Sequence, residues 1–372
     1  MKCSKSNVMM CSFSSWYKAF EDVTVKSIVL PLPDFFVSYL HADGVVLPES
    51  SSHGIYTKSA NTAMDGDEDD PDIRDDELMK MYEDDWSTPD SSEGAKVPDF
   101  GDFDESVKEA IKSLGGKVFP KLNWSSPKDA NWISFDKTLM CTCPSDIYLL
   151  LKSSEFIAHD LDQPFVHCDD AGDDSAENSP SISYCLVLKK WQPPDPSTEF
   201  RCFVHDKKLI ALCQRQATKF FSHINHERES IISDISKFHQ QKIAQRFSET
   251  SYVFDVVRPE QGKVILVDFN PFGLVTDSLL YSWEDIEGLL KNMDKRAADQ
   301  TPDFRCVESE GGVQTSDYAN YALPRDIQDL TSGEDPYKLM DLLKLRDNAD
   351  SSSEDEEETS SENASKETCT GK

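Results

Sequence analysis

The sequence is short of positive charge. Its 372 residues include 38 Lys or Arg against 69 Asp or Glu, which gives a formal net charge of −31. Because contacts with nucleic-acid phosphates require Lys and Arg, this balance argues against nucleic acid as a partner. No segment reaches the about 18 apolar residues of a membrane span, and the N-terminus lacks the apolar stretch of a signal peptide. We therefore expect a cytoplasmic protein with no membrane partner.

Two common kinds of site are also missing. The ten cysteines show no spacing typical of a disulfide framework or a zinc site; Cys141 and Cys143 are the closest pair, without a second pair or a His set nearby. No glycine-rich phosphate loop occurs, since Gly115-Gly116 and Gly311-Gly312 are typical of turns. We expect reduced thiols, and other groups would have to hold the phosphates of any bound nucleotide.

The negative charge is concentrated in two segments. Residues 65–105 hold 18 acidic and 3 basic residues, and residues 347–372 hold 9 acidic and 2 basic residues. Such segments have too little apolar surface to offset the entropy lost on ordering, so we expect both to be mostly disordered. The predicted division is an N-terminal segment packing on the core at 1–45, an acidic linker at 46–98, a core at 99–346 and an acidic tail at 347–372.

The order of the predicted elements indicates an α+β fold. We expect strands at 25–30, 117–124, 182–191, 199–205, 208–214, 252–257 and 264–272, and helices at 104–114 and 227–247, after a cap at Ser145, from Ser282 and from Asp335-Pro336. Strands follow strands instead of alternating with helices. This order favours antiparallel sheets with flanking helices over a parallel sheet.

Two aspartates lie within apolar, β-branched strand patterns. Asp255 lies in Tyr252–Val257, Asp268 in Val264–Phe272, and the Pro/Gly turn between them predicts an antiparallel hairpin. With Gln261-Gly262 at the tip, Asp255 faces Asp268, where like charges are unfavourable. Asn270 follows Asp268 by two residues and points to the same face. A bound hard cation would turn this repulsion into attraction, so the pattern predicts a Mg²⁺ site shared with phosphate oxygens.

Several basic residues on the predicted strands precede this hairpin. They are Lys121, Lys189, Lys190, Arg201 and Arg215. Each one alone could be an ordinary outward-facing charge. Together with an oxygen-ligand hairpin, they could neutralise phosphates, with Lys as a point charge and Arg as a bidentate donor.

Several motifs closely resemble the cell division cycle protein 123 family. They are Cys11-Ser-Phe-Ser-Ser-Trp-Tyr17, Lys26-Ser-Ile-Val-Leu-Pro-Leu-Pro33, Phe119-Pro-Lys-Leu-Asn-Trp-Ser-Ser-Pro-Lys-Asp129, Glu199-Phe-Arg-Cys-Phe-Val204, Val267-Asp-Phe-Asn-Pro-Phe-Gly273 and Ser332-Gly-Glu-Asp335. The resemblance covers about residues 11–45 and 97–346, in the same order.

The resemblance implies a two-lobed ATP-grasp-like fold that clamps Mg-ATP. It also implies a chaperone that binds the γ subunit of eukaryotic translation initiation factor 2, promotes formation of the heterotrimer, and so supports translation initiation and cell-cycle progression. The implied ATP contacts are Lys121, the phosphate-covering loop with Trp124, Ser126, Lys128 and Asp129, the adenine edge at Leu188, Lys189, Lys190 and Trp191, and the phosphate-facing Arg201 and Arg215. The implied Mg²⁺ ligands are Asp255, Asp268 and Asn270. Outside its complex the chain is expected to be a monomer.

Three functions remain open at this point. The first is the nucleotide-binding assembly chaperone, which we favour. The second is an ATP-dependent ligase or kinase of the ATP-grasp type, since the same basic residues could stabilise a transferring phosphoryl group. The third is a purely structural interaction protein, in which Asp268 would cap the turn before Asn270-Pro271. Asp255, in mid-strand, is harder to explain without a ligand.

Overall fold

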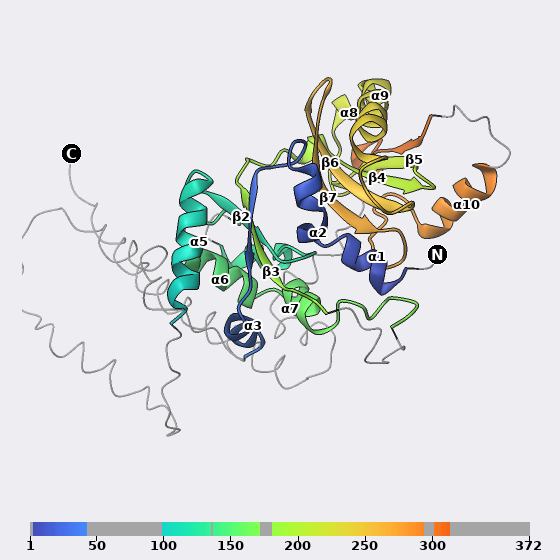
Figure 1. Cartoon of the computed structure of the whole chain (residues 1–372). Coiled ribbons are helices and arrows are strands. Elements are labelled where there is room, and N and C mark those ends of the chain that lie inside the picture. Colours follow the sequence, from blue (N-terminus) through green and yellow to red (C-terminus); the bar gives the residue numbers. More distant parts are fainter. Residues whose placement is uncertain (1–2, 43–98, 135–136, 172–180, 294–300, 313–372) are drawn as a thin grey trace, which may run out of the picture. The chain divides into compact units, whose positions relative to one another are not determined.

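The computed structural model describes residues 3–42, 99–134, 137–171, 181–293 and 301–312, which belong to one compact unit, Met1–Ser316 (Figure 1). Its helices are α1 (Lys5–Met10), α2 (Phe13–Phe20), α3 (Asp34–His41), α5 (Gly101–Ser113), α6 (Pro144–Lys152), α7 (Glu155–Asp162), α8 (Ser222–His226), α9 (Arg228–Phe238) and α10 (Trp283–Met293). Its strands are β1 (Ser27–Pro31), β2 (Val118–Lys121), β3 (Cys185–Lys190), β4 (Glu199–His205), β5 (Lys208–Gln214), β6 (Tyr252–Glu260), β7 (Lys263–Pro271) and β8 (Asp303–Arg305).

Some predicted segments lie outside the described residues. They are the acidic linker, the acidic tail and the helix predicted from Asp335-Pro336. Within the described ranges, every helix is too short or too polar to pass through a membrane.

The smaller sheet has three antiparallel strands in the order β1-β3-β2. Because successive side chains of a strand point to opposite faces, β3 contributes to two separate cores. Leu186 and Leu188 pack in a core with α3, α5, α6 and α7, while Cys185 and Val187 face a second core. A central strand buried on both faces explains the nearly continuous apolar run of β3.

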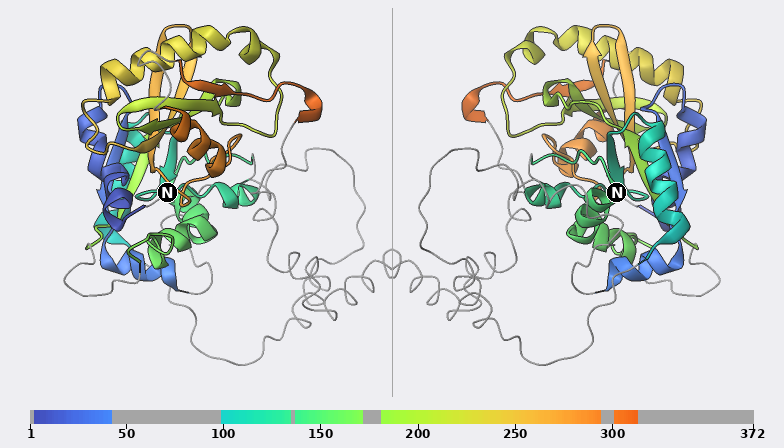
Figure 2. Two further views of the ribbon diagram at one scale, coloured as in Figure 1. Left: turned by 90° about the vertical axis from the view of Figure 1, so that its right-hand side faces the viewer. Right: turned by 90° about the vertical axis from the view of Figure 1, so that its left-hand side faces the viewer.

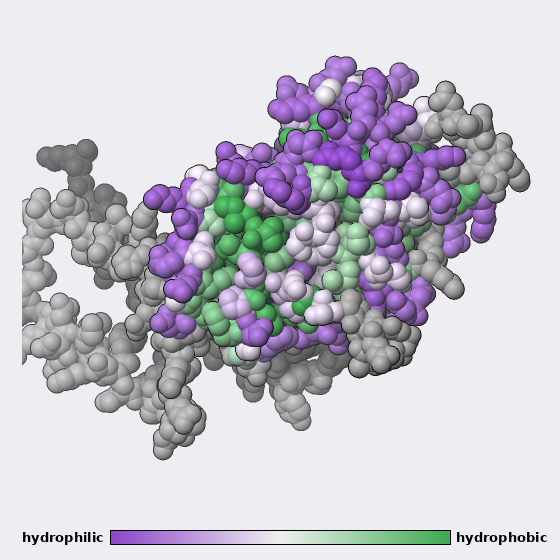
Figure 3. Space-filling model, viewed as in Figure 1, coloured by the Kyte–Doolittle hydropathy of each residue, from purple (hydrophilic) through white to green (hydrophobic). Residues whose placement is uncertain are grey.

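Strand β1 forms one edge of the smaller sheet. Its residues Ile28, Val29 and Leu30 are half-buried and Pro31 is exposed. Apolar surface gathers over this part of the face seen in Figure 3, with polar surface around it. A proline at the end of an edge strand limits further strand pairing, since it has no N–H to donate.

The larger sheet has five strands in the order β7-β6-β4-β5-β8. All its pairs are antiparallel except β5 with β8, which is parallel. Helix α9 packs Ile231 and Ile235 into the core on one face, and α10 packs Ile286 into the core on the other face (Figure 2). The turn between β4 and β5 has Asp206 and Lys207 at positive φ, 47° and 62°, as a two-residue hairpin turn matching the strand twist requires.

Helix α2 lies where the two sheets meet. Its buried aromatic residues Phe13, Trp16 and Phe20 share one core with Val187 of the smaller sheet and Phe269 of the larger one. The Trp16 and Phe269 rings meet edge to face with centroids 5.2 Å apart. Since burying each large apolar side chain contributes about 1.5–3 kcal/mol, this helix is an important tie between the sheets.

The predicted α+β fold with antiparallel sheets is confirmed, and local differences have physical reasons. Cys143, not Ser145, caps α6, because Pro144 takes the first helical position, where its missing N–H costs nothing. The helix predicted at 227–247 is α-helical only to Phe238 and continues as a π-helix at His239–Ile243. The buried His239 ring lies against β6, its Nε2 2.9 Å from the Tyr252 hydroxyl, a contact that no helical periodicity encodes.

Candidate functional site

The two aspartates of the hairpin lie opposite each other, as predicted. The β6–β7 register pairs Asp255 with Asp268 and Glu260 with Lys263. An irregularity follows directly after Asp255, where one strand has an extra residue. Such a bulge re-aims the neighbouring side chains and is common beside functional sites.

The Asp255 carboxylate is buried among arginines. Arg201 Nε and Nη2 donate to its two oxygens, each at 2.8 Å, and Arg215 Nε donates at 3.3 Å. Burial alone would raise the pKa of Asp255, but the charges of Arg201 and Arg215 outweigh it and hold that pKa below its ordinary value. Asn270 Nδ2 lies 3.5 Å from the same carboxylate. The predicted proximity of Asp255 and Asn270 is therefore present.

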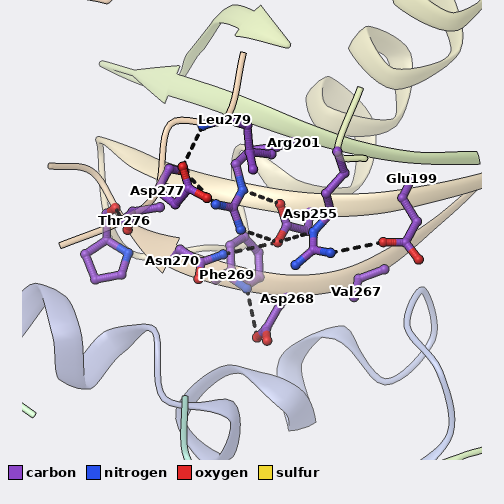
Figure 4. A network of polar contacts seen from close by, with 12 residues as sticks. Glu199, Arg201, Asp255, Val267, Asp268, Phe269, Asn270, Thr276, Asp277 and Leu279 are labelled. Atoms are coloured by element: carbon purple, nitrogen blue, oxygen red, sulfur yellow. Dashed lines mark hydrogen bonds and ion pairs between the residues drawn. The ribbon is translucent and has the colours of Figure 1, made fainter. Parts of the chain in front are cut away.

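The Asp268 carboxylate faces a different cation. Its Oδ2 pairs with the Lys121 ammonium of β2, and the Phe269 N–H donates to its Oδ1 at 3.1 Å. Figure 4 shows Asp268 turned away from the Arg201–Asp255 network. Within the described residues, no three His, Cys, Asp or Glu side chains gather closely enough to hold a metal ion. A cation here would therefore need oxygens from Asn270 and from bound phosphate groups as well as from the two aspartates.

Two lysines of the smaller sheet reach into the junction between the sheets. The ammonium groups of Lys121 and Lys189 both lie 5.3 Å from the centre of the Phe13 ring, one cation–π contact each. Lys189 is only 6% exposed, and its ammonium donates to the Val267 carbonyl at 2.8 Å. Burial lowers the pKa of Lys189 to about 8, with partial compensation from Asp268. No carboxylate within the described part of the chain pairs directly with Lys189.

Lys128 lies in the loop after β2. Together with Lys121, Lys189, Arg201 and Arg215 it forms the cationic group of the junction. Its ammonium has no hydrogen-bond or ion-pair partner within the described residues, and it interacts electrostatically with Arg215, Glu199 and Asp255. The pKa of Lys128 is lowered mainly by desolvation and secondly by the positive charge of Arg215. Much of this residue nevertheless remains in contact with solvent.

The other predicted residues of this loop have partners inside the protein. Trp124 Nε1 donates to the Val8 carbonyl at 2.8 Å. The Ser126 carbonyl accepts from the Lys128 N–H at 2.7 Å. The buried Asp129 carboxylate accepts from the Ser154 hydroxyl and from the first backbone N–H groups of α7. Their ATP contacts stay a prediction, and the contacts present here hold the loop in place.

The predicted adenine edge lies at the end of β3. The Lys190 and Trp191 N–H groups donate to the Lys26 and Lys117 carbonyls, both within 3.0 Å. Leu188 is fully buried in the core under the smaller sheet. These backbone donors are already engaged, so the adenine contact also stays a prediction.

The junction gathers five cationic side chains around fewer directly paired carboxylates. The cations are Lys121, Lys128, Lys189, Arg201 and Arg215, and the carboxylates among them are those of Glu199, Asp255 and Asp268. Asp277 and Asp160 act on Arg201 and Lys121 from further away, without an ion pair. In a chain of net charge −31, such a concentration of cations is a local feature of this junction. Chemically, the arrangement is suited to an anion with several oxygens, to which both Lys and Arg donate.

Sequence reasoning missed three contributors. Glu199 accepts from Arg215 Nη1 at 3.2 Å, and strand alternation with Arg201 could have indicated it. Phe13, under the two lysines, and Asp160, which holds Ser125, come from other elements and had no local signal.

Two cavities among the described residues lie elsewhere. One, of about 490 Å³, is lined by residues including Phe35, Phe100 and Phe103. The other, of about 470 Å³, is lined by residues including His223, His226 and Arg258. Neither cavity includes a residue of the cationic group. The junction is therefore a candidate site because of its charge and its burial.

Fold and site together define an α+β protein whose two sheets meet at a buried, cation-rich junction. The family model described as D123 matches residues 16–331. The chain belongs to this family, and the resemblance to the cell division cycle protein 123 family is confirmed.

Individual relatives match over most of their length. A translation initiation factor eIF2 assembly protein of Xenopus laevis is 42% identical over 361 residues, covering 94% of this chain and 99% of the relative. Its counterpart from Dictyostelium discoideum is 33% identical over 389 residues, covering 91% and 95%. The solved structure of Cdc123 from Schizosaccharomyces pombe is 32% identical with a TM-score of 0.61, covering 82% of this chain and 98% of that one.

Proposed function

We propose that the chain binds Mg-ATP at the junction of its two sheets. The observation that carries this proposal is the buried Lys189, which pairs with no carboxylate of the described residues; Lys128 of the loop is a second cation without such a pair there. Burying an unpaired charge such as that of Lys189 is costly unless a ligand compensates it. Polyphosphate oxygens would compensate both cations, and Lys121, Arg201 and Arg215 lie beside them as further donors.

The metal ligands would be Asp255, Asp268 and Asn270. Their oxygens are of the kind that Mg²⁺ accepts, and the carboxylates are now paired with Arg201, Arg215 and Lys121. These cations are also the expected phosphate donors. The residues fit Mg-ATP if the bound phosphates accept from these cations in place of the carboxylates. The carboxylate oxygens would then be available to bind the metal.

The role of the bound nucleotide is proposed from the relatives. Relatives covering more than 90% of this chain are named translation initiation factor eIF2 assembly proteins. We therefore infer that this chain acts in the assembly of that factor, through its γ subunit, as a chaperone in the cytoplasm. Because the charged junction joins residues of both sheets, ATP would act there as a structural cofactor that fixes their arrangement.

Calorimetric titration of the full chain tests the nucleotide site. Mg-ATP should bind, and Lys189→Met should weaken binding at least tenfold because it removes a buried phosphate donor. Lys117→Met is the matched control, since Lys117 is exposed and directly precedes β2. Equal affinity of the wild type and Lys189→Met would contradict the phosphate assignment.

A second experiment tests the partner and the fate of ATP. The chain, the γ subunit and labelled Mg-ATP are mixed, and both complex formation and the label are followed. A complex with intact ATP supports the chaperone. Loss of the γ-phosphate would instead support the ATP-dependent ligase or kinase, and absence of any complex would remove the partner assignment.

A further inference from the structure

The loop that carries Lys128 is tied at both ends to one short helix, α7. At the start of the loop, the Ser125 N–H and hydroxyl donate to the Asp160 carboxylate at 2.7 and 2.8 Å. At its end, the Asp129 carboxylate accepts from the Ser154 hydroxyl at 2.6 Å and the Glu155 N–H at 2.7 Å. A carboxylate at a helix N-terminus is also favoured by the helix dipole. Loop and helix thus form a closed clasp.

Asp160 is an unusual member of this clasp because it is a buried acid that forms no ion pair with any described residue. The residue is 4% exposed, and Lys121 interacts with it only at a distance that forms no ion pair. Its hydrogen-bond donors within the described residues come from the loop, at Ser125 and the Trp124 backbone. Burial raises the pKa of Asp160 to about 6, although these hydrogen bonds oppose the rise. A buried carboxylate has an energetic cost, so its contacts with the loop call for a role.

The position of Lys128 explains why the loop has to be held. The Lys128 ammonium has no partner of its own within the described ranges; the charges of Arg215 and Arg201 repel it, and those of Glu199 and Asp255 attract it. No direct ion pair therefore holds Lys128 beside the two guanidinium groups that repel it. The loop backbone between Ser125 and Asp129 keeps Lys128 near them, and Asp160 fixes the start of that backbone.

We infer that Asp160 is a positioning residue, which holds the loop 124–129 so that Lys128 is presented to an anionic ligand at the junction. This inference rests on the proposed nucleotide site for the identity of that ligand. The contacts of the loop with α7 do not depend on it.

The test combines two readouts on the full chain, amide hydrogen exchange of the loop and calorimetric titration with Mg-ATP. Asp160→Asn keeps the side-chain shape but loses an acceptor, so exchange at Trp124 and Ser125 should become at least tenfold faster. Asp162→Asn is the matched control, because Asp162 lies on the same helix and pairs with His41 instead. Ser125→Ala, which removes only the hydroxyl, should have a smaller effect in the same direction. Unchanged loop exchange in Asp160→Asn would overturn the inference.

A double-mutant cycle separates positioning from a general structural role. Asp160→Asn and Lys128→Met should each weaken Mg-ATP binding about tenfold, and the double variant should lose clearly less than the hundredfold expected of independent effects. Independent, multiplying losses would overturn the positioning role. If the wild type itself does not bind Mg-ATP, the proposed function fails, and loop exchange still decides whether Asp160 holds the loop.

Discussion

Replacing Lys189 by methionine should make the ligand-free protein more stable. The lysine is buried, and burial lowers its pKa from 10.5 to about 8. At about 1.36 kcal/mol per pKa unit, keeping Lys189 protonated at pH 7 costs about 3 kcal/mol. Methionine has a similar length and no charge. It loses the hydrogen bond to the Val267 carbonyl, worth about 1 kcal/mol. The expected net gain in the free energy of unfolding is therefore about 2 kcal/mol at pH 7.

The pH dependence of this gain follows from the direction of the shift. A lysine whose pKa is lower in the folded state binds fewer protons there than in the unfolded chain, so wild-type stability rises with pH through this range. The cost of Lys189 is fully present below its folded pKa of about 8 and is lost as pH rises toward 10.5. The advantage of Lys189→Met should accordingly shrink between pH 7 and pH 10.

Urea unfolding at both pH values measures these differences, with the exposed Lys117→Met as control. Saturating Mg-ATP should reduce the advantage of the variant at pH 7 by about 1.4 kcal/mol or more, because a ligand that binds the wild type at least tenfold more tightly stabilises the wild type by that much more. A variant less stable than the wild type at pH 7 without ligand would refute the reasoning, as would a gain that is equal at pH 7 and pH 10.

Three further changes are expected to have distinct effects. Asp268→Asn should weaken Mg-ATP binding because a coordinating charge is lost while shape is kept, and it should also lower the free energy of unfolding because the buried Lys121 loses its carboxylate partner; unchanged affinity by calorimetry would exclude Asp268 as a metal ligand. Asp255→Ala leaves Arg201 buried without its carboxylate and should lower the free energy of unfolding by about 3–5 kcal/mol. As the control, Asp22→Ala breaks the exposed pair with Arg246 and should change the free energy of unfolding in urea little. Deleting residues 352–372 should leave Mg-ATP affinity intact, and a large drop on titration would show that the acidic tail contacts the core.

The parts of the fold that the sequence predicted best have local signals. The strands at 199–205 and 208–214 agree with β4 and β5, because turn residues bound them on both sides. The register of Asp255 with Asp268 followed from the length and tip of one hairpin. The parallel pairing of β8 with β5 had no such signal, since it joins Ala211 to Asp303 across most of a hundred residues.

The candidate site was predictable as a set of residues and not as an arrangement. The basic residues lie on strands or in the loop after β2, but their partners belong to other elements, as with Lys121 of β2 and Asp268 of β7. Phe13 and Asp160 join the site only through packing of α2 and α7 against the junction. Strand periodicity gives the face of a side chain, and it does not give the element that covers that face.

The charges at the junction connect ligand binding to the arrangement of the two sheets. The Lys121–Asp268 pair joins β2 of the smaller sheet to β7 of the larger one, and Lys189 reaches from β3 to the Val267 carbonyl of β7. A polyanion bound here would compete with the aspartates for the same cations, so it would replace direct contacts between the sheets with contacts through the ligand. Nucleotide affinity and the stability of the junction are therefore two measurements of one set of interactions. A substitution that alters one of them by removing a charge should also alter the other.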